Sequence, residues 1–102
     1  MRTIRVKIFQ VPTWVKWCFM DYEYAKENGF DIKEYGERVA EFDREDYEPE
    51  WRVLETIFDF GNRGYIQSVC NNEYMRSISV SDLIMLDDKL YYVDSFGFKE
   101  VI

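Results

Sequence analysis

A chain of 102 residues has the length of one domain, and a sequence that is 47% hydrophobic and 19% aromatic can bury a core without disulfides or metals. With 20 acidic and 13 basic residues the net charge is -7, which repels nucleic-acid phosphates. We therefore expect no direct binding to nucleic acid. The absence of histidine removes the commonest general base and, with two cysteines, leaves too few ligands for the usual structural zinc sites.

No apolar run in the sequence approaches the roughly 20 residues that are needed to span a bilayer. The N-terminus alternates charged and apolar residues and lacks the apolar block of a secretion signal. We therefore expect a cytoplasmic protein without membrane association. In that compartment, Cys18 and Cys70 are expected to remain thiols and not to form a disulfide.

The first expected element is a strand over residues 3–11, where apolar side chains alternate with polar ones. The apolar side of this alternation consists of Ile4, Val6 and Ile8. Pro12 ends the strand because it lacks a backbone N–H. Beyond it, Trp14, Trp17 and Cys18 have helical spacing, but the stretch is too short to distinguish a helix from a strand.

Two short helical segments are expected next. Asp21 can cap a helix that runs through Asn28, and Gly29 just past its end tolerates the left-handed backbone conformation. Asp31 and Glu34 have the spacing of a capping box, but a glycine follows soon, so we expect one turn and then an extended segment over residues 37–42. The alternative for this region is a longer helix with Tyr35, Val39 and Phe42 on one stripe.

The main helix is expected over residues 50–60, because Trp51, Leu54 and Phe58 repeat at i, i+3 and i+7. Pro49 suits the first turn of this helix, and Gly61 suits its end. The pattern is weaker after the helix. There we expect a short strand with Tyr65, Ile66 and Val69, and a turn at Asn71 and Asn72.

Three apolar segments at the C-terminus, residues 83–86, 90–93 and 98–102, are separated by short turns and predict a three-stranded antiparallel meander. The first two are apolar on both alternations, so we expect the main helix and the tryptophan segment to cover the two faces of the sheet. The predicted fold class is α+β, with one domain over residues 1–102. Its antiparallel sheet consists of the N-terminal strand and the C-terminal meander, packed by one main helix and short helices.

The serine-rich segment before the meander favours a structural role over a functional one. Ser79 and Ser81 are expected to bond backbone groups of a turn, and Asp82 to fix the start of the next strand. The alternative is a binding loop in which hydroxyls and a carboxylate gather. Gly97, which lies between two phenylalanines, is expected to adopt a backbone angle that other residues avoid.

Several groups of residues carry a resemblance to a known family. They are residues 54–58 (Leu-Glu-Thr-Ile-Phe) with Asn62, residues 77–84 (Ser-Ile-Ser-Val-Ser-Asp-Leu-Ile), residues 91–98 (Tyr-Tyr-Val-Asp-Ser-Phe-Gly-Phe) and, more loosely, residues 6–10 and 19–22. In this order and spacing the chain resembles the YodL-like domain family. Two features depart from the family pattern: Arg76 stands where a histidine is common, and the acidic stretch before the main helix is heavier.

The resemblance implies a small bacterial domain that is common in Firmicutes and associated with phages and other mobile elements, sometimes within larger polyvalent proteins. It supplies no established catalytic residues to carry over. A mobile-element origin fits interference with a host system.

Residues 41–50 form the most acidic stretch of the chain, with the carboxylates of Glu41, Asp43, Glu45, Asp46, Glu48 and Glu50. If the stretch is extended, alternate carboxylates lie about 6.6 Å apart, close to the spacing of successive phosphates, and could occupy a basic groove. Alternatively, these acids are solvated loop residues that complement the dipole of the following helix.

Four aromatic residues are candidate anchors for a partner, since interface hot spots favour Trp and Tyr: Tyr47, Trp51, Trp14 and Trp17. For Trp14 and Trp17 in so aromatic a chain, however, core packing is favoured over an anchor role. Cys18 as a nucleophile would need an activating cation, and only Lys16 is close in sequence. We therefore expect no catalytic residues, no metal site and no cofactor.

These observations predict a non-enzymatic protein-binding module of phage or mobile-element origin. The expected partner is a host protein with a basic surface, such as a nucleic-acid-handling defence protein, which the acidic stretch would inhibit in the manner of an anti-CRISPR or anti-restriction protein. One alternative is a structural or regulatory interaction domain that binds through an apolar sheet face. A carboxylate- or thiol-based enzyme is the third class.

Overall fold

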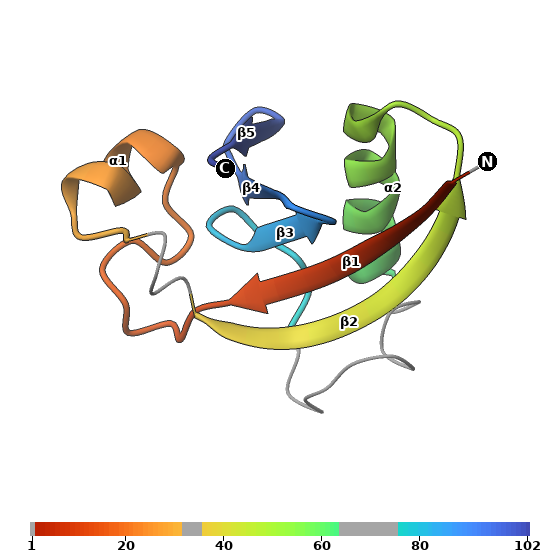
Figure 1. The fold of residues 1–102 in the computed structure, drawn as a ribbon. Helices are drawn as coiled ribbons and strands as arrows, with labels where there is room; N and C mark the ends of the chain where they lie inside the picture. Colours follow the sequence, from red (N-terminus) through yellow and green to blue (C-terminus); the bar gives the residue numbers. More distant parts are fainter. Residues whose placement is uncertain (1, 32–35, 64–75) are drawn as a thin grey trace.

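The computed structural model describes residues 2–31, 36–63 and 76–102 (Figure 1). Its elements in chain order are β1 (Arg2–Gln10), α1 (Tyr22–Glu27), β2 (Glu37–Asp46), α2 (Glu50–Asn62), β3 (Leu83–Leu86), β4 (Lys89–Val93) and β5 (Phe98–Glu100). Several predicted features lie outside the described residues: the turn at Glu34, Tyr35, the strand at Tyr65, Ile66 and Val69, the turn at Asn71 and Asn72, and Cys70.

All strands join one antiparallel sheet in the order β2-β1-β3-β4-β5. The predicted α+β fold, with an N-terminal strand beside a C-terminal meander, is confirmed. The sheet also has a strand that the fold prediction left out, because β2 pairs with β1 from Arg2 opposite Asp46 to Gln10 opposite Glu37. The alternative of a helix through Val39 and Phe42 is therefore wrong.

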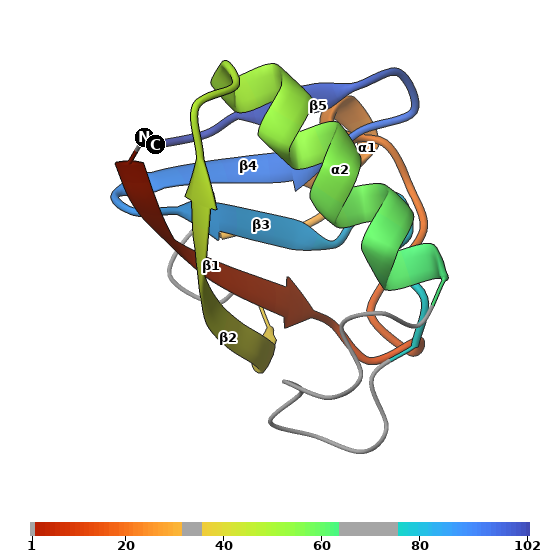
Figure 2. The same ribbon diagram turned by 90° about the vertical axis from the view of Figure 1, so that its right-hand side faces the viewer.

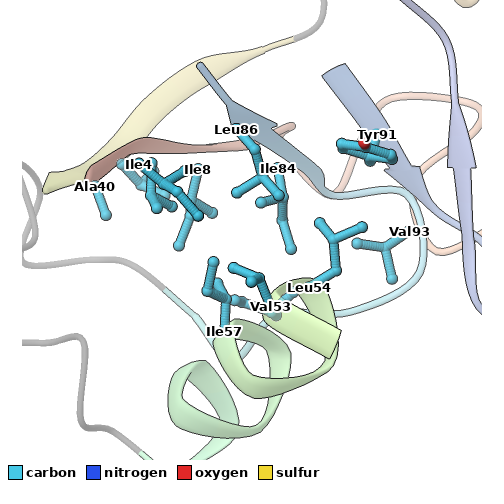
Figure 3. Close-up of a cluster of buried hydrophobic side chains, with 13 residues drawn as sticks. Ile4, Ile8, Ala40, Val53, Leu54, Ile57, Ile84, Leu86, Tyr91 and Val93 are labelled. Carbon is cyan, nitrogen blue, oxygen red and sulfur yellow. The ribbon is translucent and has the colours of Figure 1, made fainter. Parts of the chain in front are cut away.

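One face of the sheet packs against α2 (Figures 1 and 2). The predicted alternation in β1 is confirmed, since Ile4, Val6 and Ile8 are at most 2% exposed and belong to this core. From α2, Val53, Leu54 and Ile57 fill the same core, and Figure 3 shows side chains of β1, β3 and α2 converging there.

The opposite face is covered by the tryptophan-containing segment between β1 and α1, as predicted, and also by α1, which was not predicted to lie there. The side chains that meet there are Trp17, Tyr22, Phe30 and Tyr92, in edge-to-face and tilted ring pairs. The Tyr92 hydroxyl donates to the carbonyl of Met20 at 2.6 Å, so the buried phenol satisfies its polar atom.

Helix α1 forms as its capping residue predicts, whereas the tryptophan segment before it forms turns. Asp21 caps α1 by accepting from the backbone N–H of Tyr24 at 2.9 Å, and Gly29 has a φ of +100°, as predicted. The helical spacing of the tryptophans instead belongs to successive turns, in which the N–H of Val15 bonds the carbonyl of Pro12 and the N–H of Cys18 bonds that of Val15.

Gly61 lies within α2 and does not end it, which corrects the expectation that this glycine closes the helix. The helix continues to Asn62. A glycine is needed at this position because of tertiary packing and not because the helix ends there. A Cβ at this position would lie 2.6 Å from Cγ1 of Ile78, a side chain that is only 2% exposed. Gly61 thus lets the end of α2 approach the segment before β3.

Gly61→Ala is therefore expected to lower the free energy of unfolding by about 1–3 kcal/mol through overpacking against Ile78. Helix propensity alone predicts the opposite sign, a gain of roughly 1 kcal/mol. Urea denaturation followed by circular dichroism measures the difference, with the exposed α2 variant Glu55→Ala as the control. A Gly61→Ala protein as stable as the parent would contradict the close packing.

Candidate functional site

Residues 41–46 of the acidic stretch belong to strand β2, and residue 50 begins α2. The interpretation as a loop before the helix therefore applies only to residues 47–49. Residues 37–46 are extended, as the phosphate-like interpretation requires. On one face of β2, Glu41, Asp43 and Glu45 stand opposite Lys7, Arg5 and Thr3 of β1. The acids therefore share a surface with cations that the strand pairing brings to them.

The first carboxylates of this face are held in ion pairs. Glu41 lies between the Arg5 Nε, at 2.7 Å, and the Arg38 Nη1, at 2.6 Å. Asp43 accepts from the Arg5 Nη1 at 3.0 Å. Hydrogen bonding from Arg5 is the main cause that lowers the pKa of Glu41. The middle of β2 consequently presents paired charges and not a bare row of anions.

Asp46 has a structural role at the end of β2. Its carboxylate accepts from the backbone N–H of Glu48 at 2.8 Å and from the Arg44 Nε at 3.0 Å, and the residue is 8% exposed. These bonds, the one from Glu48 first, lower the pKa of Asp46. Asp46 fixes the turn into α2 and offers little surface to a partner.

Glu50, in the first turn of α2, is bonded to two residues of β4. The Lys89 Nζ lies 3.0 and 3.1 Å from its two carboxylate oxygens, and the Tyr91 hydroxyl donates to it at 3.2 Å. Lys89 is the main cause that lowers the pKa of Glu50. This carboxylate ties α2 to β4.

Four predicted site residues remain exposed together at the junction of β2 and α2. Tyr47 is 75% exposed and Trp51 is 57% exposed. Glu45 and Glu48 are exposed, and neither side chain forms an ion pair within the part of the chain that the structure describes. We call Glu45, Tyr47, Glu48 and Trp51 the β2–α2 corner.

The two N-terminal tryptophans do not join this corner. Trp17 is 4% exposed and packs on Phe30 with ring centroids 5.1 Å apart, so it is a core residue, and core packing prevails over the anchor interpretation. Trp14 is 84% exposed. However, it follows the C-terminal end of β1, whereas the corner lies beside the N-terminal end of that strand (Figure 1).

The serine-rich segment forms a buried polar network around Asp82, which is 0% exposed. Arg76 Nη1 lies 2.9 and 3.1 Å from the two Asp82 oxygens, Gln10 Nε2 donates to Asp82 at 3.0 Å, and the N–H of Ser79 donates at 2.9 Å. Ser81 accepts from the N–H of Phe19 at 2.8 Å. The network is occupied by internal partners, which favours the structural interpretation over a binding loop.

Cys18 is a free thiol that is 8% exposed, and its Sγ lies 3.9 Å from the Arg76 Nη2. The same guanidinium already donates to Asp82 and to the carbonyl of Val11.

Within residues 2–31, 36–63 and 76–102, no group of three acidic or cysteine side chains is placed to hold a metal ion. Nor is any helix in these ranges long and apolar enough to cross a membrane.

A second exposed surface, which the sequence did not predict, lies at the turn between β4 and β5. Phe96, in the turn between β4 and β5, is 96% exposed, and Gly97 beside it has the expected unusual backbone angle, with a φ of +75°. Glu55 of α2 and Phe98 of β5 line a groove next to this turn. Only the position of Phe96 within a predicted turn could have indicated that this ring is exposed.

The chain matches no protein-family model, no curated protein and no solved structure.

Removing Arg76 is expected to destabilise the protein strongly at neutral pH. Arg76→Met leaves the Asp82 carboxylate buried without its counter-charge, a change that typically costs about 3–5 kcal/mol. Burial already raises the pKa of Asp82, against the opposing effect of Arg76, and loss of the guanidinium raises it further. Because the folded-state pKa then lies above the unfolded value, Arg76→Met should regain stability as the pH falls from about 7 to about 5.

Urea denaturation at both pH values tests this expectation, with Arg76→Met/Asp82→Asn as the companion variant. The double variant lacks the buried charge, so it should be more stable than Arg76→Met at neutral pH and insensitive to pH in this interval. Equal pH dependence of the two variants would show that Asp82 is not the titrating group.

Proposed function

We propose that this chain is a non-enzymatic protein-binding module of phage or mobile-element origin, in keeping with its resemblance to the YodL-like domain family. Its partner is a basic, nucleic-acid-handling host protein, and binding inhibits that protein by competition, in the manner of an anti-CRISPR or anti-restriction protein. The module acts by covering a surface and not by making or breaking bonds.

The observation that carries the proposal is the β2–α2 corner, where two largely exposed aromatic side chains stand next to two carboxylates without ion-pair partners among the described residues. Tyr47 and Trp51 are the residue types that contribute most when they are desolvated at an interface. Glu45 and Glu48 would attract a basic partner and select against acidic ones.

The structure narrows the surface that can act in this way. Glu41 and Asp43 are neutralised by arginines of the same sheet, and Asp46 and Glu50 fix the turn and the helix. A continuous phosphate-like row along β2 therefore receives little support. The docking surface of the proposal is the corner, with Glu45 and Glu48 as its charged part.

The apolar sheet face of the alternative proposal lacks an open surface in the described residues. One apolar face is covered by α2, and the other is covered by α1 and the segment before it. The corner is consequently the better candidate for a docking surface.

Affinity capture from a bacterial host lysate, quantified by mass spectrometry, tests the proposal. The parent protein should capture a basic nucleic-acid-handling protein, and Tyr47→Ala/Trp51→Ala should reduce this capture roughly tenfold or more. Glu45→Lys/Glu48→Lys should reduce it most at low salt, because exposed charges are screened as the ionic strength rises. The purified partner should lose nucleic-acid binding when the parent protein is added.

Two matched controls make the result specific. Trp14→Ala removes an exposed tryptophan from the other end of β1, and Glu23→Lys/Glu27→Lys reverses two exposed charges on α1. Neither should affect capture. Capture that survives both corner variants, or a captured partner that still binds its nucleic acid, would refute the docking surface or the competition, respectively.

A further inference from the structure

A groove lies between α2 and β5 and is lined by residues of both elements. In Figure 2, α2 crosses in front of β5. Its first part has a volume of about 480 Å³ and is lined by Trp51, Leu54, Tyr91 and Phe98, among others. A second hollow of about 320 Å³ continues past Phe98 toward Val80 and Val93. The Phe58 and Phe98 rings, with centroids 6.2 Å apart, connect the two elements at its floor. We call this feature the α2–β5 groove.

The charged residues that line the α2–β5 groove are all acidic: Glu50, Glu55, Asp94 and Glu100. Glu50 is paired with Lys89, whereas Glu55 and Glu100 are exposed and form no ion pair within the described ranges. The pKa of Tyr91 reflects the same negative environment. Burial first, and then the charges of Glu50 and Glu100, raise the pKa of Tyr91 to about 12. The groove thus combines an apolar floor with a negative rim.

Strand β5 borders this groove and is the last strand of the sheet. Within the described residues it has a strand neighbour, β4, on one side only, so backbone groups along its outer side are available for pairing. Phe98 and Glu100 alternate with Lys99 and line the groove, whereas Lys99 does not. A strand added to β5 would place every second side chain over the groove in the same way.

We propose that the α2–β5 groove binds an extended, cationic segment of the partner protein, which pairs with β5 and inserts an apolar side chain between two basic ones. The inserted side chain covers Leu54 and Phe98, and Lys or Arg residues two positions before and after it approach Glu55 and Glu100. This inference rests on the proposed function, because the segment belongs to the same basic partner that contacts Trp51 at the corner.

The arrangement follows a known division of labour in strand addition, in which backbone hydrogen bonds give affinity and pockets for alternate side chains give specificity. The charge of the groove excludes a nucleic-acid strand, whose phosphates would meet carboxylates. It also selects against acidic or neutral segments of similar shape, because they would leave the rim carboxylates desolvated without a counter-charge.

The probe is a dye-labelled heptapeptide, Thr-Lys-Thr-Phe-Thr-Lys-Thr, whose phenylalanine and lysines lie on one side of an extended chain. Fluorescence anisotropy should show saturable binding to the parent protein. The isomer Thr-Thr-Lys-Phe-Lys-Thr-Thr has the same composition but places its lysines on the opposite side from the phenylalanine. It should bind several-fold more weakly, as should the version with glutamate in place of lysine.

Glu55→Gln/Glu100→Gln should weaken binding of the probe roughly tenfold, whereas Glu23→Gln/Glu27→Gln, which removes the same number of charges from α1, should not weaken it. In amide NMR spectra, the probe should shift resonances of Trp51, Gly97 and Phe98. Shifts confined to residues 37–46 would place the segment on β2 and overturn the inference. No saturable binding up to about 1 mM peptide, or equal binding of the two isomers, would also overturn it.

The experiments distinguish a groove that binds no partner segment from a protein that has no basic partner. If the corner variants abolish capture of a basic partner while Glu55→Gln/Glu100→Gln leaves capture intact, the binding module stands and the α2–β5 groove is not its site. If the peptide dimerises the protein instead of binding to its groove, the sedimentation velocity of the mixture will reveal a second copy as the occupant, which also contradicts the inference.

Discussion

The buried carboxylate of Asp82 is the point on which the rest of the structure depends. Through Gln10 it holds the end of β1, through Ser79 the turn before β3, and through Arg76 the segment after β1. A fully buried charge is tolerated only when it is paired and hydrogen-bonded, and here each contact ties down a different segment. No buried side-chain polar atom among the described residues lacks a partner, so the network adds order without leaving an unsatisfied group.

Strand β2 shows how tertiary pairing changes the meaning of an acidic stretch. In isolation the carboxylates of residues 41–50 suggest a repulsive, solvated strip. Pairing β2 with β1 brings Arg5 to Glu41 and Asp43, which converts repulsion within one strand into attraction between two. Among the described residues, the carboxylates that form no ion pair then include Glu45 and Glu48 at the β2–α2 corner and Glu55 and Glu100 at the rim of the α2–β5 groove.

Much of the fold could be predicted from sequence because its signals are local. The alternation of Ile4, Val6 and Ile8, the i, i+3, i+7 pattern of α2 and the turns of the meander each specify an element within a few residues. What could not be predicted depends on distant partners. The Arg5 partner of Glu41 lies 36 positions away in sequence, and the reason for Gly61 is the side chain of Ile78, 17 positions away. The same holds for Trp17, whose residue type fits an interface anchor but whose neighbours in space are Phe30 and Tyr92.

The two edges of the sheet differ in a way that decides where a partner strand can be added. β2 is ten residues long and carries charges of both signs. Its two arginines, Arg38 and Arg44, are already paired within the chain, so a further strand would have to desolvate these ion pairs. β5 is three residues long and offers fewer backbone groups, yet it borders an apolar groove that no described cation lines. A short edge gives little affinity by itself, so binding there must draw most of its free energy from the side chain in the groove and from the flanking charges. Selectivity for one class of segment follows from that balance, since a weak backbone contribution cannot retain a chain whose side chains do not fit.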